Sequence, residues 1–225
     1  MKIDTNTSNV LKNFSEINPS LYFKAGNVLK TISPAKNIIA EAQIDPTIPQ
    51  DFGIYDLTQF LALVSAFGDD ADVEFEAKNM IISDGDRRLR YLFAAANLII
   101  LPPDNIKTLE NVVVNFKLSE DNVKSILQMK SLLMSNEVIF ECENGKFSVS
   151  VTDADNQNSN YYRINLTDLE GTSDFKLIFK ADNFKMMPQD YNVEVSSKDK
   201  AIIANFVSDD EKLKYWIAIE SKSSV

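Results

Sequence analysis

The chain repeats one pattern four times, in which a short amphipathic helical stretch precedes a set of strand-like runs. The helices are predicted from apolar residues at three-to-four spacing, and the strands from alternating apolar and polar residues. The predicted helices cover residues 7–17, 57–67, 120–130 and 181–187. The predicted strands cover residues 21–25, 28–32, 38–43, 72–76, 80–83, 87–93, 138–142, 147–151, 161–166, 191–195, 201–206 and 215–219. This repetition predicts an α+β scaffold of helices packed on antiparallel sheets.

The repeat falls into two similar halves, which predicts two domains rather than one. Leu57 and Phe60 of the second helix recur in the third helix as Val123 and Ile126, at the same spacing. Between the halves an apolar run ends at the prolines of 102–103, which block both helix and central strand. The predicted organisation is an N-terminal domain at 1–95, an interdomain connector at 96–110 and a C-terminal domain at 111–225.

The composition is strongly acidic, with 33 acidic against 23 basic residues, a formal charge of -10 and a pI near 4.6. Such a surface repels nucleic acid on average, although the charge of one face can differ from the net charge. No apolar run approaches the ~20 residues of a membrane span, and the N-terminus lacks a secretory pattern. We therefore expect a cytosolic protein that makes no contact with a membrane.

The residues that usually carry chemistry are missing. The chain has no histidine, which removes the commonest general base and metal ligand, and its six glycines stand too far apart for a phosphate-binding loop. Cys142 alternates with acidic neighbours, so we expect it to face the core. We predict no enzyme activity, no catalytic residue, no metal site and no cofactor.

Three lysines are predicted to point away from the core faces of their helices. Lys12 lies opposite Val10, Leu11 and Phe14, Lys124 lies opposite the third helix's apolar stripe, and Lys185 stands clear of its helix's apolar residues. Outward lysines usually form only a solvated face. If the helices of all repeats lined one concave surface, however, these lysines would attract DNA phosphates weakly and without regard to sequence.

Three segments carry a resemblance to a known family. They are residues 10–18 (VLKNFSEIN), 54–73 (IYDLTQFLALVSAFGDDADV) and 179–195 (FKADNFKMMPQDYNVEV). In their order and spacing the chain resembles the DNA polymerase sliding clamps of T-even-type bacteriophages, the replication processivity factors. The resemblance covers nearly the whole length. It implies a sliding-clamp (DNA clamp) fold, in which two similar domains each bring two helices packed on antiparallel sheets, assembled as a homotrimeric ring around duplex DNA.

The resemblance also implies partners. A clamp loader ATPase would open the ring and close it around primed DNA, and the DNA polymerase would dock by a short terminal peptide. In T-even-type phages the clamp is also linked to late transcription, which implies RNA polymerase late-transcription factors as partners in the cytoplasm of the bacterial host. Lys12 and Lys185 match lysines of the family's helices and are carried over as DNA-facing residues, whereas Lys124 rests on helical phase alone.

By analogy with clamps, the ring closes by pairing an edge strand of one subunit with an edge strand of the next. The predicted strands are 87–93 and 161–166, because an unpaired strand edge is a template for association. The candidate interface residues are Arg87, Arg88, Arg90, Tyr91, Tyr161, Tyr162, Arg163 and Ile164. A solvated edge strand that discourages aggregation explains the arginines equally well.

The connector carries a second candidate site. Leu98, Ile99, Ile100 and Leu101 are too apolar for a free linker and too few for a core helix. They are predicted to border a groove for partner peptides, an arrangement known in the clamp fold, or else to seal the domain junction. The serine-rich end, 221–225, is expected to be mobile.

Two other classes of protein compete with the clamp interpretation. A structural or assembly protein of a virion would also suit repeated strands and an acidic, histidine-free composition. An enzyme ranks third, because no nucleophile has a base to activate it. The arrangement of the lysines separates the first two classes, since a clamp must bring Lys12, Lys124 and Lys185 to one cavity.

Overall fold

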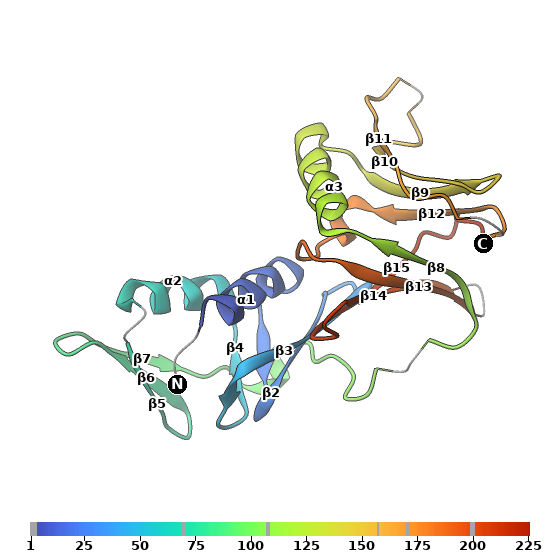
Figure 1. The fold of residues 1–225 in the computed structure, drawn as a ribbon. Coiled ribbons are helices and arrows are strands. Elements are labelled where there is room, and N and C mark those ends of the chain that lie inside the picture. The colour runs from blue at the N-terminus through green and yellow to red at the C-terminus, as the bar shows by residue number, and fades with distance from the viewer. Residues whose placement is uncertain (1–3, 69–70, 107–108, 157, 170–171, 199–200) are drawn as a thin grey trace. The chain divides into compact units, whose positions relative to one another are not determined.

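The computed structural model describes residues 4–68, 71–106, 109–156, 158–169, 172–198 and 201–225 (Figure 1). The chain divides into two compact units, Met1–Asn105 and Ile106–Val225. The division falls inside the segment 96–110 that the sequence suggests as a connector. Within the described ranges, none of the helices has the length and apolar character needed to cross a membrane.

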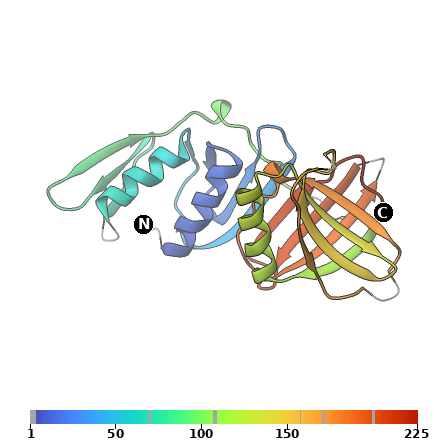
Figure 2. The ribbon, with the colours of Figure 1, turned by 90° about the horizontal axis from the view of Figure 1, so that it is seen from above.

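The first unit packs two helices against short antiparallel strands. Its helices are α1 (Thr5–Ile17) and α2 (Leu57–Phe67), and a 3₁₀ turn, η1 (Ala96–Leu98), follows its last strand. Its strands are β1 (Leu21–Phe23), β2 (Gly26–Ile32), β3 (Ile38–Ile48), β4 (Phe52–Ile54), β5 (Asp72–Phe75), β6 (Asn79–Ser83) and β7 (Arg88–Leu92). β1 pairs with β4, β2 with β3, and β6 with both β5 and β7. α1 and α2 lie side by side, as Figure 2 shows from above.

The second unit has helix α3 (Glu120–Leu133) and a 3₁₀ turn, η2 (Ala181–Asn183). Its strands are β8 (Val112–Leu118), β9 (Glu137–Glu143), β10 (Lys146–Thr152), β11 (Tyr162–Asn165), β12 (Phe175–Lys180), β13 (Tyr191–Lys198), β14 (Ala201–Ser208) and β15 (Leu213–Ala218). One sheet has the order β11-β10-β9-β12. In the other, β13 pairs with β8 and β14, and β14 pairs with β15. α3 packs on β9 and β10, so the prediction of an α+β fold with helices on antiparallel sheets is confirmed.

The two units repeat one topology. β1 pairs with β4 as β9 pairs with β12, and β2 and β3 form a hairpin as β10 and β11 do. α1 therefore corresponds to α3, whereas our overlay of the halves matched the second helix with the third. Amphipathic helices share the spacing of their apolar residues, so spacing alone does not determine which two helices correspond.

The three helices begin at side chains that cap them. The carboxylates of Asp4 and Asp56 accept the backbone N–H of Thr7 and Gln59 at 2.8 Å each, and Ser119 caps α3 in the same manner. Each cap satisfies one of the N–H groups that have no partner in the first helical turn. α2 ends at Gly68, whose φ of 77° suits a residue without Cβ.

The helix predicted at 181–187 is wrong, because only Ala181–Asn183 forms a single 3₁₀ turn. Pro188 follows directly and disfavours the helical conformation at Met187. Phe184 and Met186 are both buried while Lys185 and Met187 are half-buried, an alternating pattern rather than a helical one. Among the described residues the second unit therefore has α3 as its α-helix, where the sequence suggested two.

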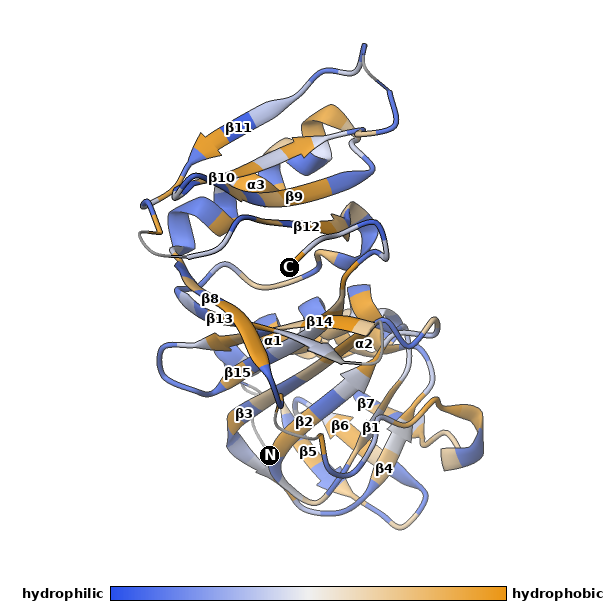
Figure 3. Cartoon of the chain, turned by 90° about the vertical axis from the view of Figure 1, so that its right-hand side faces the viewer, coloured by the Kyte–Doolittle hydropathy of each residue, from blue (hydrophilic) through white to orange (hydrophobic). Residues whose placement is uncertain are grey.

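Each unit has its own aromatic core. In the first, the rings of Phe23 and Phe93 stack on Phe52 with centroids 4.5 and 4.8 Å apart. In the second, Phe140 and Phe206 belong to a larger cluster that joins β9, β12 and β14. Figure 3 shows hydrophobic residues along β9 and β12. Burial of such rings contributes about 1.5–3 kcal/mol each, so each aromatic cluster stabilises the unit that contains it.

Candidate functional site

Lys12 lies on α1, on the side away from the core, as the sequence suggests. Its side chain is exposed, whereas Val10, Leu11 and Phe14 are buried. Within the described residues, the Lys12 ammonium has no hydrogen-bond or ion-pair partner. Its charge is therefore available to an anionic ligand.

Lys124 is also exposed, but its charge is engaged on its own helix. Its Nζ lies 2.6 Å from Glu120 Oε1 and 4.0 Å from Asp121 Oδ1. The hydrogen bond to Glu120 raises the pKa of Lys124 above its ordinary value. Both acids lie in the first turn of α3, where the helix dipole favours negative charge. The local field around Lys124 is thus mixed rather than positive.

Lys185 is half-buried and follows η2 instead of lying on a helix. A lysine that the sequence analysis passed over, Lys130 of α3, lies close to the same segment. Its Nζ donates to the carbonyl oxygens of Ala181 at 3.2 Å and Phe184 at 2.8 Å. The structure therefore brings Lys130 next to the residue that precedes Lys185. The feature of the sequence that could have indicated this contact is a lysine in the last turn of a helix, a position from which lysine side chains bond carbonyl oxygens.

β7 and β11, the strands predicted to face other subunits, are both sheet edges. On β7, Arg88, Arg90 and Leu92 are exposed, while Leu89 and Tyr91 are half-buried on the other face. Neither Arg88 nor Arg90 has an ion-pair partner among the described residues. The strand thus presents two unpaired cations beside an open row of backbone groups.

Arg87 and Tyr91, which were also predicted for this edge, make their contacts inside the first unit. Arg87 precedes the strand, forms an ion pair with Asp84 and lies over the ring of Phe67 at 5.1 Å. The hydrogen bond from Arg87 lowers the pKa of Asp84. Tyr91 packs edge-on against Phe60 with ring centroids 5.2 Å apart, and burial raises its pKa.

On the other edge, Tyr161 lies just before β11 and is 73% exposed. Arg163 is exposed, while Tyr162 and Ile164 are half-buried on the opposite face of the strand. β11 pairs with β10 on one side, through partners such as Ile164 and Val149. Among the described residues, no strand pairs with its other side.

The opposite edge of the same sheet, β12, is covered by the chain's own C-terminal residues. Lys176 and Ser224 exchange two backbone hydrogen bonds of 2.8 Å, and the Ile178 N–H donates to the hydroxyl of Ser223 at 2.9 Å. The segment 221–225, expected to be mobile, is thus hydrogen bonded along a strand. The expectation failed because serine hydroxyls can bond to the backbone as well as to water.

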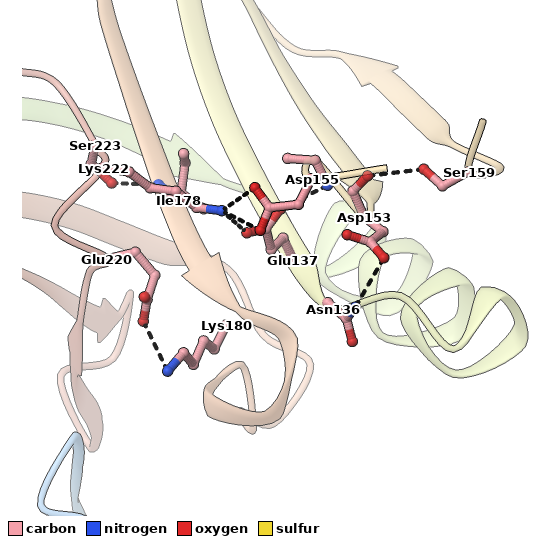
Figure 4. Close-up of polar contacts among 11 residues, drawn as sticks. Asn136, Glu137, Asp153, Asp155, Ser159, Ile178, Lys180, Glu220, Lys222 and Ser223 are labelled. Atoms are coloured by element: carbon pink, nitrogen blue, oxygen red, sulfur yellow. Dashed lines mark hydrogen bonds and ion pairs between the residues drawn. The ribbon is translucent and has the colours of Figure 1, made fainter. Parts of the chain in front are cut away.

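An acidic cluster fixes this C-terminal segment (Figure 4). Glu137 is only 6% exposed, accepts the Ala154 N–H at 2.8 Å and forms an ion pair with Lys222. Lys222 also lies 3.3 Å from Asp155, and its hydrogen bond to Glu137 raises its pKa. Lys222 therefore compensates the buried carboxylate and holds the segment against β12.

The four apolar residues of the connector do not share one environment. Ile99 is 7% exposed and packs against Gly53, where an added Cβ would lie 2.6 Å from Ala94 O and 2.7 Å from Ile99 Cδ1. Leu98, Ile100 and Leu101 are exposed. Ile99 is thus an anchor on β4, and the others are available to a partner.

Of these four residues, Leu101 lines a cavity of about 510 Å³. One wall is formed by β1, β2 and the turn between them, and the other by residues 101–104 of the connector. The lining residues are Tyr22, Lys24, Ala25, Gly26, Asn27, Val28, Lys30, Leu101, Pro102, Pro103 and Asp104. The size and apolar lining suit a short peptide.

The described part of the chain holds no group of three or more acidic or cysteine side chains placed to bind a metal ion. Cys142 is buried, and desolvation raises the pKa of its thiol. A thiol in this state is a poor nucleophile.

Comparisons with known proteins cover both units. A family model described as DNA polymerase processivity factor matches residues 4–101, and one described as gp45 sliding clamp, C terminal, matches residues 115–221. The sliding clamp of Vibrio phage KVP40 is 28% identical over 98% of this chain and 100% of the relative. That of Enterobacteria phage T4 is 27% identical over 100% of this chain and 99% of the relative.

The fold is also found in solved structures. Proliferating Cellular Nuclear Antigen from Entamoeba histolytica superposes with a TM-score of 0.67, covering 95% of this chain and 94% of the other at 14% identity. At such low identity the similarity concerns the fold alone. It confirms the prediction of a sliding-clamp fold.

Proposed function

Since this chain belongs to the family of phage sliding clamps that serve as DNA polymerase processivity factors, we propose that it forms a homotrimeric ring around duplex DNA. The ring would tether the replicative polymerase to its template. Clamps act by holding rather than by catalysis, and the same non-enzymatic role is proposed for this chain.

One observation carries the ring proposal, namely the contrast between the edges of the second unit's sheet. β12 is covered by the segment 221–225, while β11 is open. The first unit offers β7 as an open edge in turn. Pairing β7 of one copy with β11 of the next is a head-to-tail contact, and such contacts close into rings when the rotation allows. The unpaired Arg88 and Arg90 would add charge contacts across this seam.

Lysines would supply the contact with DNA. Lys12, Lys124 and Lys185 are the proposed DNA-facing residues, and Lys12 carries a charge with no partner among the described residues. A few lysine–phosphate contacts give weak, salt-sensitive attraction without sequence preference, which permits sliding. The net charge of -10 would discourage DNA from binding elsewhere.

The connector would receive partners. Leu98, Ile100 and Leu101 are exposed beside the cavity or on the segment leading to it, and we assign them to docking of the polymerase's terminal peptide. Loading by an ATP-driven clamp loader and a link to late transcription are proposed from family membership. The expected location is the cytoplasm of the bacterial host.

Two measurements test this function. Native mass determined at several protein concentrations should reveal a reversible threefold species. The same protein should lengthen the products of the phage polymerase on a primed circular template in a loader- and ATP-dependent manner. A monomer at every concentration, together with unchanged product length, would contradict the proposal.

A further inference from the structure

The C-terminal strap, residues 220–225, bonds the backbone groups on the side of β12 that does not pair with β9. The N–H and C=O of Lys176 exchange two hydrogen bonds of 2.8 Å with Ser224. The Ile178 N–H donates to Ser223 Oγ at 2.9 Å, and the Ile178 C=O accepts the first N–H of the strap at 2.8 Å. The strap therefore satisfies both backbone groups of each of these two β12 residues, which would otherwise form a free strand edge.

The first unit is closed in the same way. The residues after β7 return to β4, where the Ala94 N–H donates to Gly53 O at 2.8 Å and the two residues form a β-bridge. β4 and β12 have the same place in the repeated topology, because each pairs with the strand that follows the first helix of its unit. The bridge between Lys176 and Ser224 is thus the counterpart of the bridge between Gly53 and Ala94. A cover that both units share belongs to the fold and is not a chance contact of a chain end.

A bare β12 edge would attract a strand that carries cations. Glu137, which lies opposite Lys180 on the neighbouring strand β9, is only 6% exposed, and Lys222 of the strap forms an ion pair with it (Figure 4). Lys222 Nζ also lies 3.3 Å from Asp155. Removing the strap would take this cation away from both carboxylates. An incoming strand with its own cations would compensate them again, while its backbone replaced the hydrogen bonds of the strap.

β7 of a second copy of the chain has both properties. It is a sheet edge, and its exposed Arg88 and Arg90 have no ion-pair partner among the described residues. The two arginines are two positions apart on a strand, so they project from the same face. β7 is also the strand that we pair with β11 of the next subunit. Without the strap, the sheet β11-β10-β9-β12 would offer β7 two edges instead of one.

We propose that the C-terminal strap prevents β7 of another copy from pairing with β12 and thereby directs subunit association to β11. The proposal rests on the seam of the proposed ring, and it adds the reason why the opposite edge of the same sheet takes no subunit. A head-to-tail contact closes into a ring only when the rotation between subunits is suitable, and otherwise it continues into open assemblies. A second acceptor edge would therefore compete with ring closure.

The test removes the strap from β12 with Ser224→Pro, which lacks the N–H that bonds Lys176 O, combined with Lys222→Met. At low protein concentration, amide hydrogen exchange at Lys176 and Ile178 should accelerate by about tenfold or more, because the edge is bare. As the concentration rises, sedimentation velocity should show a weight-average mass about twofold or more above that of the wild type. The two amides should then slow again, because β7 of a second copy covers them.

The matched control combines Ser221→Pro with Lys36→Met. Position 221 is the second residue of the turn that the Ser223 N–H closes on Glu220 O at 3.0 Å, where proline is favoured, and Lys36 is exposed in the loop between β2 and β3. This control should keep the mass and the exchange rates of the wild type. If the amides of the strap variant stay protected at low concentration, a chain that ends at Glu220 replaces it, since that chain lacks the bonds from Ser223 and Ser224.

Adding Arg88→Glu and Arg90→Glu to the strap variant identifies the strand that docks. The heavier species and the protection at high concentration should both disappear. Heavier species that persist in this combination come from a surface other than β7 and overturn the proposal. Fast exchange at every concentration together with the mass of the wild type overturns it as well, because the bare edge then takes no second copy.

The mass of the wild type separates this proposal from the proposed function. A threefold wild type with a strap variant of the same mass overturns the role of the strap alone. A monomeric wild type with a strap variant that associates through its arginines supports the pairing of β7 with β12 and overturns the ring. Monomers in both cases overturn the two proposals together.

Discussion

The Lys130 ammonium on α3 reaches the carbonyl oxygen of Phe184 at 2.8 Å, in the segment where a fourth helix was expected. A second hydrogen bond to Ala181 O satisfies another carbonyl of this turn. The lysine thus supplies to η2 part of the bonding that a continuing helix would have supplied from its own backbone.

We expect Lys130→Met to lower the free energy of unfolding by about 1–3 kcal/mol, because it leaves partly buried carbonyls without a charged donor. Urea unfolding measures the change. Lys124→Met on the same helix is the control and should change the free energy of unfolding much less, since it removes only exposed ion pairs. Equal effects at the two sites would show that the Lys130 contacts add nothing specific.

The pair of Glu137 and Lys222 should decide whether the edge of β12 stays covered. Lys222→Met leaves a buried carboxylate unpaired and should lower the free energy of unfolding, by less than the loss of a fully buried pair because Lys222 is partly exposed. Amide hydrogen exchange at Lys176 and Ser224 should accelerate. Adding Glu137→Gln should recover part of the loss. Wild-type protection in Lys222→Met would mean that the serine hydrogen bonds alone hold the segment.

The lowered pKa of Asp210 should make the free energy of unfolding depend on pH. Its carboxylate accepts the Ser208 hydroxyl at 2.6 Å and the Lys212 N–H at 3.1 Å, and the Ser208 hydrogen bond is the main cause that lowers its pKa below the ordinary 3.8. Because the folded pKa is the lower one, this contribution to stability is complete above pH 3.8 and is lost as the pH falls through the folded value.

The free energy of unfolding should therefore decrease as acid is added below that pH, and it should decrease less steeply in Asp210→Asn. Ser208→Ala, which removes the principal donor, should flatten the curve in the same direction. Urea midpoints across the acid range provide the measurement. Parallel curves for the wild type and both variants would exclude Asp210 as a source of the pH dependence.

The helices and strands whose apolar residues recur at a regular spacing were predictable from the sequence. α1 and α3 follow from apolar residues at helical spacing, and β7 and β11 follow from alternation. β8 and β12 were missed although Val114, Phe116 and Leu118 alternate with polar or exposed neighbours in β8. The repeat pattern of one helix followed by three strands leaves out these two strands, which precede α3 and η2.

Contacts between distant residues were not predictable in this way. Lys24 and Asp104 are 80 residues apart, and no spacing rule connects them. Arg87 was grouped with a strand, yet it pairs with Asp84 three residues earlier in the turn. The connector residues were correctly noticed as too apolar for a linker, but which one is buried depends on Gly53, a contact that only the folded chain reveals.

If β7 of one copy pairs with β11 of the next, reversing the charge on β7 should weaken the assembly. Arg88→Glu combined with Arg90→Glu should raise the dissociation constant of the assembly by about tenfold or more, since like or unpaired charge at a desolvated contact is costly. Sedimentation equilibrium measures the association. Lys36→Glu, in the loop between β2 and β3, is the matched control and should assemble normally. An unaltered assembly in the arginine variant would rule out β7 as the seam.

We expect the three proposed DNA-facing lysines to contribute unequally to processive synthesis. Lys12 has no partner among the described residues, whereas Lys124 is shared with Glu120 and Asp121, so Lys12→Ala should reduce processive synthesis more than Lys124→Ala. Each lost phosphate contact should lower the salt dependence of DNA binding by about one unit of slope. The triple variant that adds Lys185→Ala should keep the native mass of the wild type while losing processivity at moderate salt. Wild-type processivity and salt dependence in that variant would discard all three lysines as DNA contacts, because the acidic remainder of the chain has no reason to attract DNA by itself.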